Sequence, residues 1–176
     1  HAIRKLQDES GGFTEFVPLP YVAAEAPMYR KGKSRQGPTL REALLMHAVP
    51  RLALNGAISN IQTSWVKMGR DGAMLALQCG ANDLGGSLMN ESITRAAGAE
   101  HGQEWPPAEM AAAISHVGRQ ARMRTTLYAE APAAQQERAF NAGALSQIIN
   151  SDAGKFQTSK SLDNAQTSHC PAGQAQ

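Results

Sequence analysis

The stretch Asn82-Asp83-Leu84-Gly85-Gly86-Ser87-Leu88-Met89-Asn90-Glu91-Ser92 decides the fold class of this chain. It combines a short strand-like segment, a Gly-Gly turn and the beginning of a helix that carries further polar residues. In α/β proteins this order presents polar side chains and free backbone N–H groups at the carboxyl end of a strand. The stretch therefore predicts an α/β fold with a ligand-facing edge.

Three segments of the chain are predicted to be strands that are each followed by a helix. They are Phe13–Leu19, Asn60–Met68 and Ala81–Leu84. Pro18 should lie at a strand end because proline cannot donate to a sheet. Strand–helix alternation predicts parallel strands with helical crossovers. About three parallel strands would leave a sheet edge unpaired, so we expect the C-terminal part of a larger (β/α) barrel.

The local helix signals divide the rest of the chain. Helices are expected over Ala2–Ser10, from Pro38 toward Asn55 with a kink at Pro50, over Asp71–Cys79, Leu88–Ala97 and Trp105–Gly118, and weakly over Ala133–Asn150. Thr39 and Glu42 have the spacing of a capping box. We expect a barrel portion over residues 1–128 and a low-complexity, disordered tail over 129–176. Because the chain begins with His1 rather than Met, and Ala2–Ser10 resembles the end of an amphipathic helix, a fragment or a processed product is expected.

The composition excludes several classes of protein. The chain has 176 residues, 42% of them hydrophobic, and a net charge of +2, which indicates one soluble domain without a basic surface for nucleic acid. No apolar run reaches the roughly 20 residues of a membrane helix. Cys79 and Cys170 are too few for a disulfide framework and too far apart for a metal motif. A reducing cytoplasm is the expected location.

Polar residues gather at the predicted carboxyl ends of the strands. These candidates for ligand contact are Thr14, Glu15, Gln62, Ser64, Trp65, Lys67, Asn82 and Asp83. A hydrogen-bond network inside the barrel is the alternative interpretation, because polar groups in apolar strands need partners.

Further candidates lie in the turns and loops. Gly85-Gly86 allows a close approach of the backbone to a ligand, and Glu91 either faces the site or pairs with Arg95 on the helix surface. His101 lies in a loop, where a base is often functional. The loop Glu25–Lys31 is either a lid or an ordinary surface loop, and the run Arg119–Arg124 is interpreted as a solvated face or a contact with missing sequence.

Eight motifs, taken together and in order, resemble the C-terminal part of the FO synthase radical-SAM family, in the branch called CofH. They are Gly12–Pro20, Glu25–Tyr29, Asn60–Met68, Asn82–Gly86, Met89–Ile93, Ala96–Ala99, His101-Gly102 and Arg124–Tyr128. The resemblance covers about residues 1–128.

The resemblance implies an enzyme on a TIM-like (β/α) barrel that uses S-adenosylmethionine and a 4Fe-4S cluster. Such enzymes join L-tyrosine to 5-amino-6-(D-ribitylamino)uracil during biosynthesis of the deazaflavin FO. The family's CxxxCxxC cluster motif is absent here, and a cluster needs about three or four thiolates. We therefore expect the ligands on a missing N-terminal half-barrel, with a CofG-type half or subunit as a further partner, and no activity from this chain alone.

The implied substrates refine the roles of the candidates. Neither substrate carries phosphate, so the Gly85-Gly86 turn is expected to meet a carboxylate, a uracil carbonyl or a ribityl hydroxyl. Asn82, Asp83 and Gln62 match the donors and acceptors of a pyrimidine edge. Glu15 and His101 are the candidates for proton transfer.

Two other functions remain open. The menaquinone-pathway futalosine enzymes are a sister radical-SAM family that shares the Gln-x-Ser-Trp and Asn-Asp-x-Gly-Gly features, and substrate assays separate the two. A non-catalytic half-barrel binding module would instead be a stable, soluble monomer as written, which a thermal melt tests.

Overall fold

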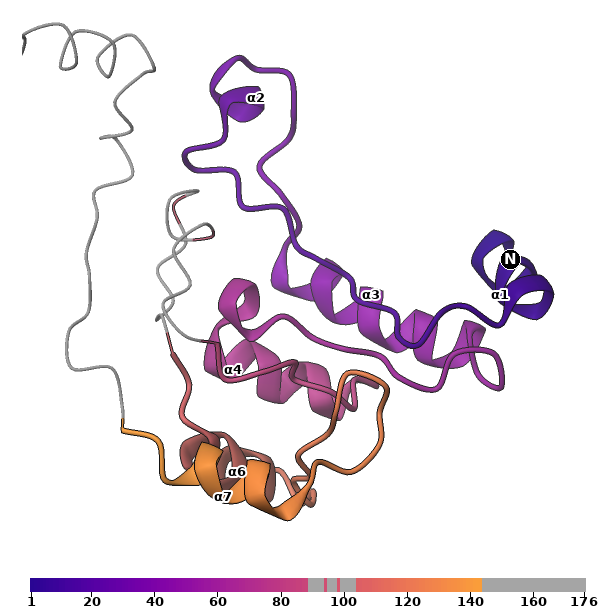
Figure 1. Ribbon diagram of the computed structural model, residues 1–176. Helices are drawn as coiled ribbons and strands as arrows, with labels where there is room; N and C mark the ends of the chain where they lie inside the picture. The colour runs from indigo at the N-terminus through magenta and orange to yellow at the C-terminus, as the bar shows by residue number, and fades with distance from the viewer. Residues whose placement is uncertain (89–93, 95–97, 99–103, 144–176) are drawn as a thin grey trace, which may run out of the picture.

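The computed structural model describes residues 1–88, 94, 98 and 104–143 of the chain. Its described part is rich in helices: α1 (Ala2–Ser10), α2 (Pro27–Arg30), α3 (Leu40–Ala53), α4 (Trp65–Gln78), α6 (Pro107–His116) and α7 (Ala133–Phe140) (Figure 1). Within these residues no helix is long and apolar enough to cross a membrane.

The three predicted strands are present as short pairings. Phe16 pairs with Ile61 and Gln62 pairs with Asp83, both in the parallel direction. Hydrogen bonds of 2.9 Å join Gln62 N–H to the Phe16 carbonyl and Thr63 N–H to the Asp83 carbonyl. The order and direction of the strands are as predicted, but in the described residues the pairings are isolated bridges rather than full strands.

The second strand ends earlier than the sequence predicts. Asn60–Met68 was expected to be extended, whereas α4 begins at Trp65 with Ser64 as its N-cap. Trp65 and Val66 favour strands intrinsically, but both are buried in the core at 2% and 9% exposure, and tertiary packing outweighs such preferences. Gly69, at φ 71° and ψ 170°, interrupts α4 directly after the end of this expected strand.

The helix ends with local signals are confirmed. Gly11 ends α1 in the left-handed conformation at φ 59°, which glycine adopts without steric penalty. Thr39 and Glu42 form the complete capping box at the start of α3. This helix continues past Pro50 to Ala53, so the proline lies inside the helix as predicted.

The main core lies where α4 meets α6 and the end of the third strand. Trp65 and Trp105 pack edge to face with ring centroids 5.8 Å apart, and Ala73, Ala76 and Leu77 of α4 complete the centre of this core. A smaller core joins Leu54, Ile58 and Ile61 to Phe16. Figure 1 shows α4 between α3 and α6, so α4 is the element that fixes the ends of the second and third strands.

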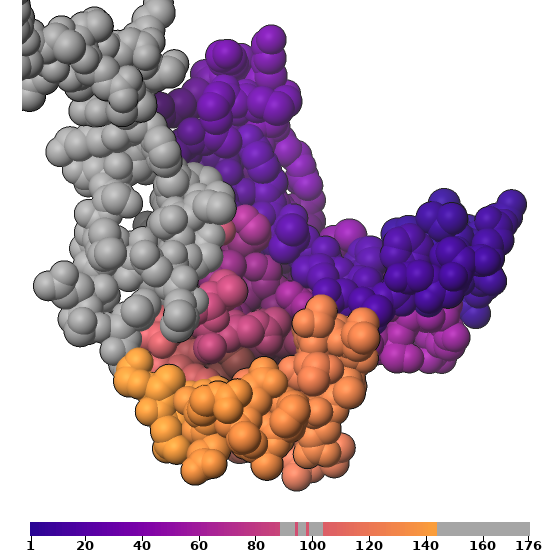
Figure 2. Space-filling model, in the orientation of Figure 1, coloured from indigo at the N-terminus to yellow at the C-terminus, as the bar shows by residue number. Residues whose placement is uncertain are grey.

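The remaining predictions are met only in part by the described residues. The helix predicted over Ala133–Asn150 begins at Ala133 as α7, but it ends at Phe140. Most of the helix predicted over Leu88–Ala97 and the tail beyond residue 143 lie outside the described part of the chain. Figure 2 shows the α1 segment (indigo) and the α2 segment (purple) projecting from the body of the molecule.

Candidate functional site

The parallel pairings bring three of the predicted site residues together. Arg124 Nη2 lies 3.5 Å from Glu15 Oε2, 3.3 Å from Gln62 Oε1 and 2.5 Å from Asp83 Oδ2. The Tyr128 hydroxyl contacts Glu15 Oε2 at 2.5 Å and also contacts Asp83 Oδ2. We call these five residues the carboxylate cluster. It contains side chains from all three strand segments and from a fourth segment about forty residues further along the chain.

A tight turn delivers Arg124 and Tyr128 to the cluster. Arg124 pairs with Glu130 in an antiparallel bridge, and Thr125 N–H donates to the Ala129 carbonyl at 2.8 Å. Tyr128 has φ 63°, a conformation that costs a residue other than glycine about 1–2 kcal/mol. The Arg124 guanidinium lies 4.0 Å from the centroid of the Tyr128 ring, and this contact and the hydroxyl's hydrogen bonds offset that strain.

The cluster fixes the ionisation of its two donors. Burial alone would lower the pKa of Arg124, but the hydrogen bond and the charge of Asp83 outweigh it and raise that pKa. Burial also raises the pKa of Tyr128, and its hydrogen bonds to Asp83 and Glu15 raise it further. At neutral pH Arg124 is therefore a cation and Tyr128 a protonated donor.

The two carboxylates differ in what they have left to offer a ligand. Asp83 is 8% exposed, and its Oδ1 accepts from Gly85 N–H at 2.8 Å while its Oδ2 faces Arg124 and Tyr128. The Glu15 side chain is 33% exposed, and no donor among the described residues contacts its Oε1. Asp83 is therefore held on all sides, whereas Glu15 retains an open acceptor.

Asn82 lies on the other side of the strand from this cluster. Its Oδ1 accepts from Arg51 Nη2 at 2.6 Å and from Ile61 N–H at 2.8 Å. Successive side chains on a strand point to opposite faces, so Asn82 is directed toward α3 when Asp83 is directed toward the cluster. Its oxygen holds the strands and α3 together in this structure.

The Gly-Gly turn rests on two other candidates. Trp65 is 2% exposed and donates its indole N–H to the Gly86 carbonyl at 2.9 Å. Gly85 has φ 76°, and a Cβ at this position would lie 3.0 Å from Gln62 Nε2. Gly86 has open space where a Cβ would be. The turn therefore needs its first glycine to let Gln62 lie against the backbone.

The other candidates are more loosely connected to the cluster. The Thr14 carbonyl accepts from Asn60 Nδ2 at 2.8 Å, and the Ser64 hydroxyl makes no capping bond at the start of α4. Glu91 and His101 lie outside the described residues.

Sequence reasoning missed the two donors of the cluster. The run Arg119–Arg124 was interpreted as a solvated face or a contact with missing sequence, whereas Arg124 is half-buried against Asp83. Neither residue has a periodic signal, because both lie in an irregular turn. The one pointer to them was the similarity of Arg124–Tyr128 to the family motif.

The residues do not form a metal centre in the described part of the chain. No three His, Cys, Asp or Glu side chains gather there in a way that would hold a metal ion. Cys79 is a half-buried free thiol at the C-cap of α4, at the helix end where the sequence predicted it.

The comparisons with known proteins agree with the resemblance in the sequence. The family model described as "CofH/MqnC C-terminal region" matches residues 10–137. The chain is 53% identical over 126 residues to FO synthase of Nocardia farcinica (strain IFM 10152), which covers 72% of this chain and 15% of that protein. It is 51% identical over 129 residues to FO synthase of Mycobacterium tuberculosis (strain ATCC 25618 / H37Rv), covering 73% and 15%.

A shorter relative matches the same region. The chain is 49% identical over 126 residues to the 5-amino-6-(D-ribitylamino)uracil–L-tyrosine 4-hydroxyphenyl transferase of Methanocaldococcus jannaschii, covering 72% of this chain and 35% of that protein. The chain therefore spans about a seventh of the length of the FO synthases and about a third of that of the transferase.

Proposed function

The chain belongs to the family of CofH/MqnC C-terminal regions, and we propose that it is the substrate-side part of an enzyme that transfers the 4-hydroxybenzyl unit of L-tyrosine to 5-amino-6-(D-ribitylamino)uracil. About half of the aligned residues are identical to FO synthases and to a transferase named for these two substrates. This identity supports the same chemistry in a complete enzyme that contains this chain.

We place the chain at the end of a (β/α) barrel. The two parallel pairings, each followed by a helix or a turn, support this placement because parallel strands need such crossovers. The carboxylate cluster would then face the barrel interior, where residues at the carboxyl ends of strands meet substrate.

The residues of this chain do not fit the iron–sulfur cluster that the family implies. The whole sequence has two cysteines, fewer than the thiolates that a 4Fe-4S cluster needs, and the described residues offer no alternative group of ligands. We therefore assign the cluster and S-adenosylmethionine to other parts of the complete enzyme, and the role of this chain to substrate binding and proton transfer.

The observation that carries this role is the open carboxylate oxygen of Glu15 beside Arg124 and Tyr128. Arg124 and Tyr128 hold the Glu15 side chain through Oε2, which leaves Oε1 to accept a proton or a hydrogen bond from a substrate. The diaminouracil carries amino and ring N–H donors that match this acceptor. Arg124 contacts Gln62 as well as Glu15. The Gln62 side chain therefore adds an amide that can pair with a pyrimidine edge.

The test is Glu15→Gln in the complete enzyme, with formation of FO measured from tyrosine and the diaminouracil. Loss of a positioned general base lowers kcat by at least about a hundredfold, whereas the isosteric amide preserves the shape of the cluster. Glu9→Gln on α1 is the matched control, because Glu9 is exposed and forms only a 3.8 Å ion pair with Lys5. Equal activity of the two variants would overturn the role of Glu15.

The same assay separates the remaining alternatives. The sister futalosine enzymes are less well supported, because the relatives reported above are named for FO or for the uracil–tyrosine transfer. Turnover of a futalosine substrate by the complete enzyme, without FO formation, would favour them. Binding without any turnover would favour a non-catalytic module.

A further inference from the structure

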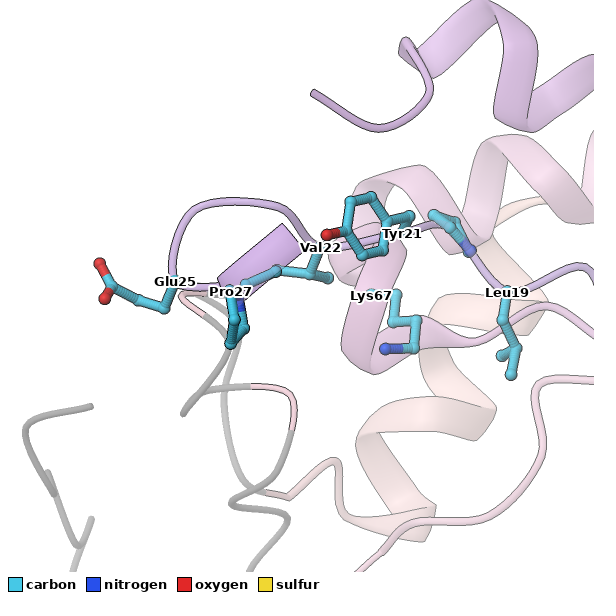
Figure 3. Close-up of a pocket in the computed structure, with 8 residues that line it drawn as sticks. Leu19, Tyr21, Val22, Glu25, Pro27 and Lys67 are labelled. Atoms are coloured by element: carbon cyan, nitrogen blue, oxygen red, sulfur yellow. The ribbon is translucent and has the colours of Figure 1, made fainter. Parts of the chain in front are cut away.

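An open groove lies between the loop that follows the first strand and the first turn of α4. Its volume is about 560 Å³, within the usual range of roughly 300–1,000 Å³ for small-molecule sites. Leu19, Tyr21, Val22 and Pro27 form most of one wall, and Lys67 of α4 forms the other (Figure 3).

Lys67 is the one cation among the residues that line this groove. No carboxylate among the described residues pairs with its ammonium group. The groove's one carboxylate, Glu25, is engaged by Arg30 and points away from Lys67 in Figure 3. The groove therefore presents an uncompensated positive charge beside an apolar wall.

The short turn of helix that carries Lys67 offers it no carboxylate. Lys67 lies in the first turn of α4, which contains no acidic residue and is separated from the rest of the helix by the non-helical Gly69. An anion bound in the groove would supply the missing partner.

The apolar wall opposite Lys67 is held in place by contacts within the protein. Gly37 lies so close to the backbone of Tyr21 that a Cβ there would lie 2.3 Å from the Tyr21 carbonyl oxygen. Ser34 Oγ donates to the Tyr21 hydroxyl at 3.3 Å, and the ion pair between Arg30 and Glu25 closes the short segment around α2. These contacts hold the segment that includes Glu25–Lys31, the loop for which the sequence left a lid open as an interpretation. Its apolar surface therefore loses little conformational entropy when it binds a ring.

Of the two substrates in the proposed function, only one carries both an anion and an apolar aromatic ring. The diaminouracil has no carboxylate or phosphate, whereas L-tyrosine has an α-carboxylate. The carboxylate cluster is a poor binding site for that carboxylate, because its cation, Arg124, already forms ion pairs with Asp83 and Glu15. Lys67 has no such engagement.

We propose that this groove is the L-tyrosine subsite, with Lys67 binding the α-carboxylate and the Leu19–Pro27 wall contacting the ring. This inference rests on the proposed function and assigns its two substrates to different places. The groove holds tyrosine, and the carboxylate cluster holds the diaminouracil. Lys67 is then a determinant of specificity for the amino acid.

The experiment compares L-tyrosine with tyramine, which lacks only the carboxylate, by calorimetric titration of the complete enzyme. The unmodified enzyme binds tyrosine more tightly than tyramine. In Lys67→Met the affinity for tyrosine falls by at least about tenfold, because a hydrogen bond to a charged group is lost, while the affinities for tyramine and for the diaminouracil stay within about threefold. Lys67→Arg keeps the charge and restores most of the preference for tyrosine.

Lys33→Met is the matched control, since Lys33 lies exposed on the same loop and does not line the groove. It leaves all three affinities unchanged. An unchanged tyrosine affinity in Lys67→Met, or an equal loss for tyrosine and tyramine, would overturn the subsite while FO formation by the unmodified enzyme still supported the proposed function. Failure of the unmodified enzyme to bind either substrate would instead reject the function itself.

Discussion

Gly85 and Gly86 are adjacent in the sequence, but their backbones have different requirements. Gly85 has φ 76° and approaches Gln62 Nε2, whereas Gly86 has no positive φ and open space around the position of a Cβ. The sequence predicted the turn from the Gly-Gly pair and assigned the same ligand-facing role to both residues. Only the structure distinguishes the glycine that shapes the cluster from the one that leaves room.

Gly85→Ala is therefore expected to destabilise the protein by about 1–2 kcal/mol, because an alanine in the left-handed region is strained and its Cβ would press on Gln62. Gly86→Ala is the control and should change the free energy of unfolding by less than about 0.5 kcal/mol. Urea unfolding of the three proteins measures both values. Equal effects of the two substitutions would contradict the backbone geometry of this turn.

Asn82 and Asp83 show how far single residues were predictable from the sequence. Both were assigned to the substrate because both are polar and lie at a strand end. The alternation of side chains along the strand sends Asn82 to Arg51 and Asp83 to Arg124. Choosing between them requires knowing which face of the strand is covered by α3, and that information comes from residues far away in the sequence.

At the scale of elements, boundaries set by local chemistry were predictable and those set by packing were not. Gly11 ends α1, and the capping box begins α3, because these signals act within one turn of helix. The sequence predicted that the helix of α4 begins at Asp71, whereas it begins at Trp65. No residue near Trp65 in the sequence indicates that it packs against Trp105 in a core. The pairing partners of Arg124 and Tyr128 are likewise non-local.

His47 on α3 makes the stability of this helix dependent on pH. Its ring is fully buried, Nδ1 lies 2.8 Å from the Ala43 carbonyl, and Nε2 has no hydrogen-bond partner among the described residues. Burial lowers the pKa of His47, and the bond to Ala43 opposes this shift only in part. The folded state therefore keeps the ring neutral at a pH where the unfolded chain protonates it.

The sign follows from proton linkage. The unfolded chain binds the proton below about pH 6.5 and the folded state does not, so the stability is fully present above that pH and falls as the pH drops toward the folded pKa. We expect the melting temperature to decrease between about pH 7.5 and pH 5.5, and His47→Leu to reduce this decrease. His116→Leu, at an exposed position on α6, is the control. A His47→Leu profile as steep as that of the unmodified protein would show that other groups cause the decrease.

At the scale of the whole molecule, the described residues leave one helix face apolar and exposed. Leu45, Val49 and Leu52 of α3 are 45%, 55% and 79% exposed, and their spacing places them on one stripe of the helix. A shallow groove lined by Leu40, Leu44 and Leu45 lies beside this stripe.

The parallel order of the strands was predicted correctly, but the length of each strand was not, because each has few partners among the described residues.

The apolar stripe of α3 gives a prediction that compares this chain with the complete enzyme. Because the chain spans about 15% of the length of the FO synthases, the placement in a barrel implies that other parts of the enzyme cover the stripe. Leu45→Gln should then change the free energy of unfolding of this chain alone by less than about 0.5 kcal/mol, since Leu45 is already exposed. In the complete enzyme the same change should cost about 1.5–3 kcal/mol, the value of a buried leucine.

Leu127→Gln is the control in both proteins, because Leu127 is 80% exposed in the turn that carries Tyr128 and lies apart from this stripe in the sequence. Its effect should be small in the chain and in the complete enzyme alike. Calorimetric melts of the four variants and the two unmodified proteins decide the matter. If Leu45→Gln has the same small effect in both contexts, the stripe faces solvent in the complete enzyme, and the placement of α3 against the rest of a barrel is wrong.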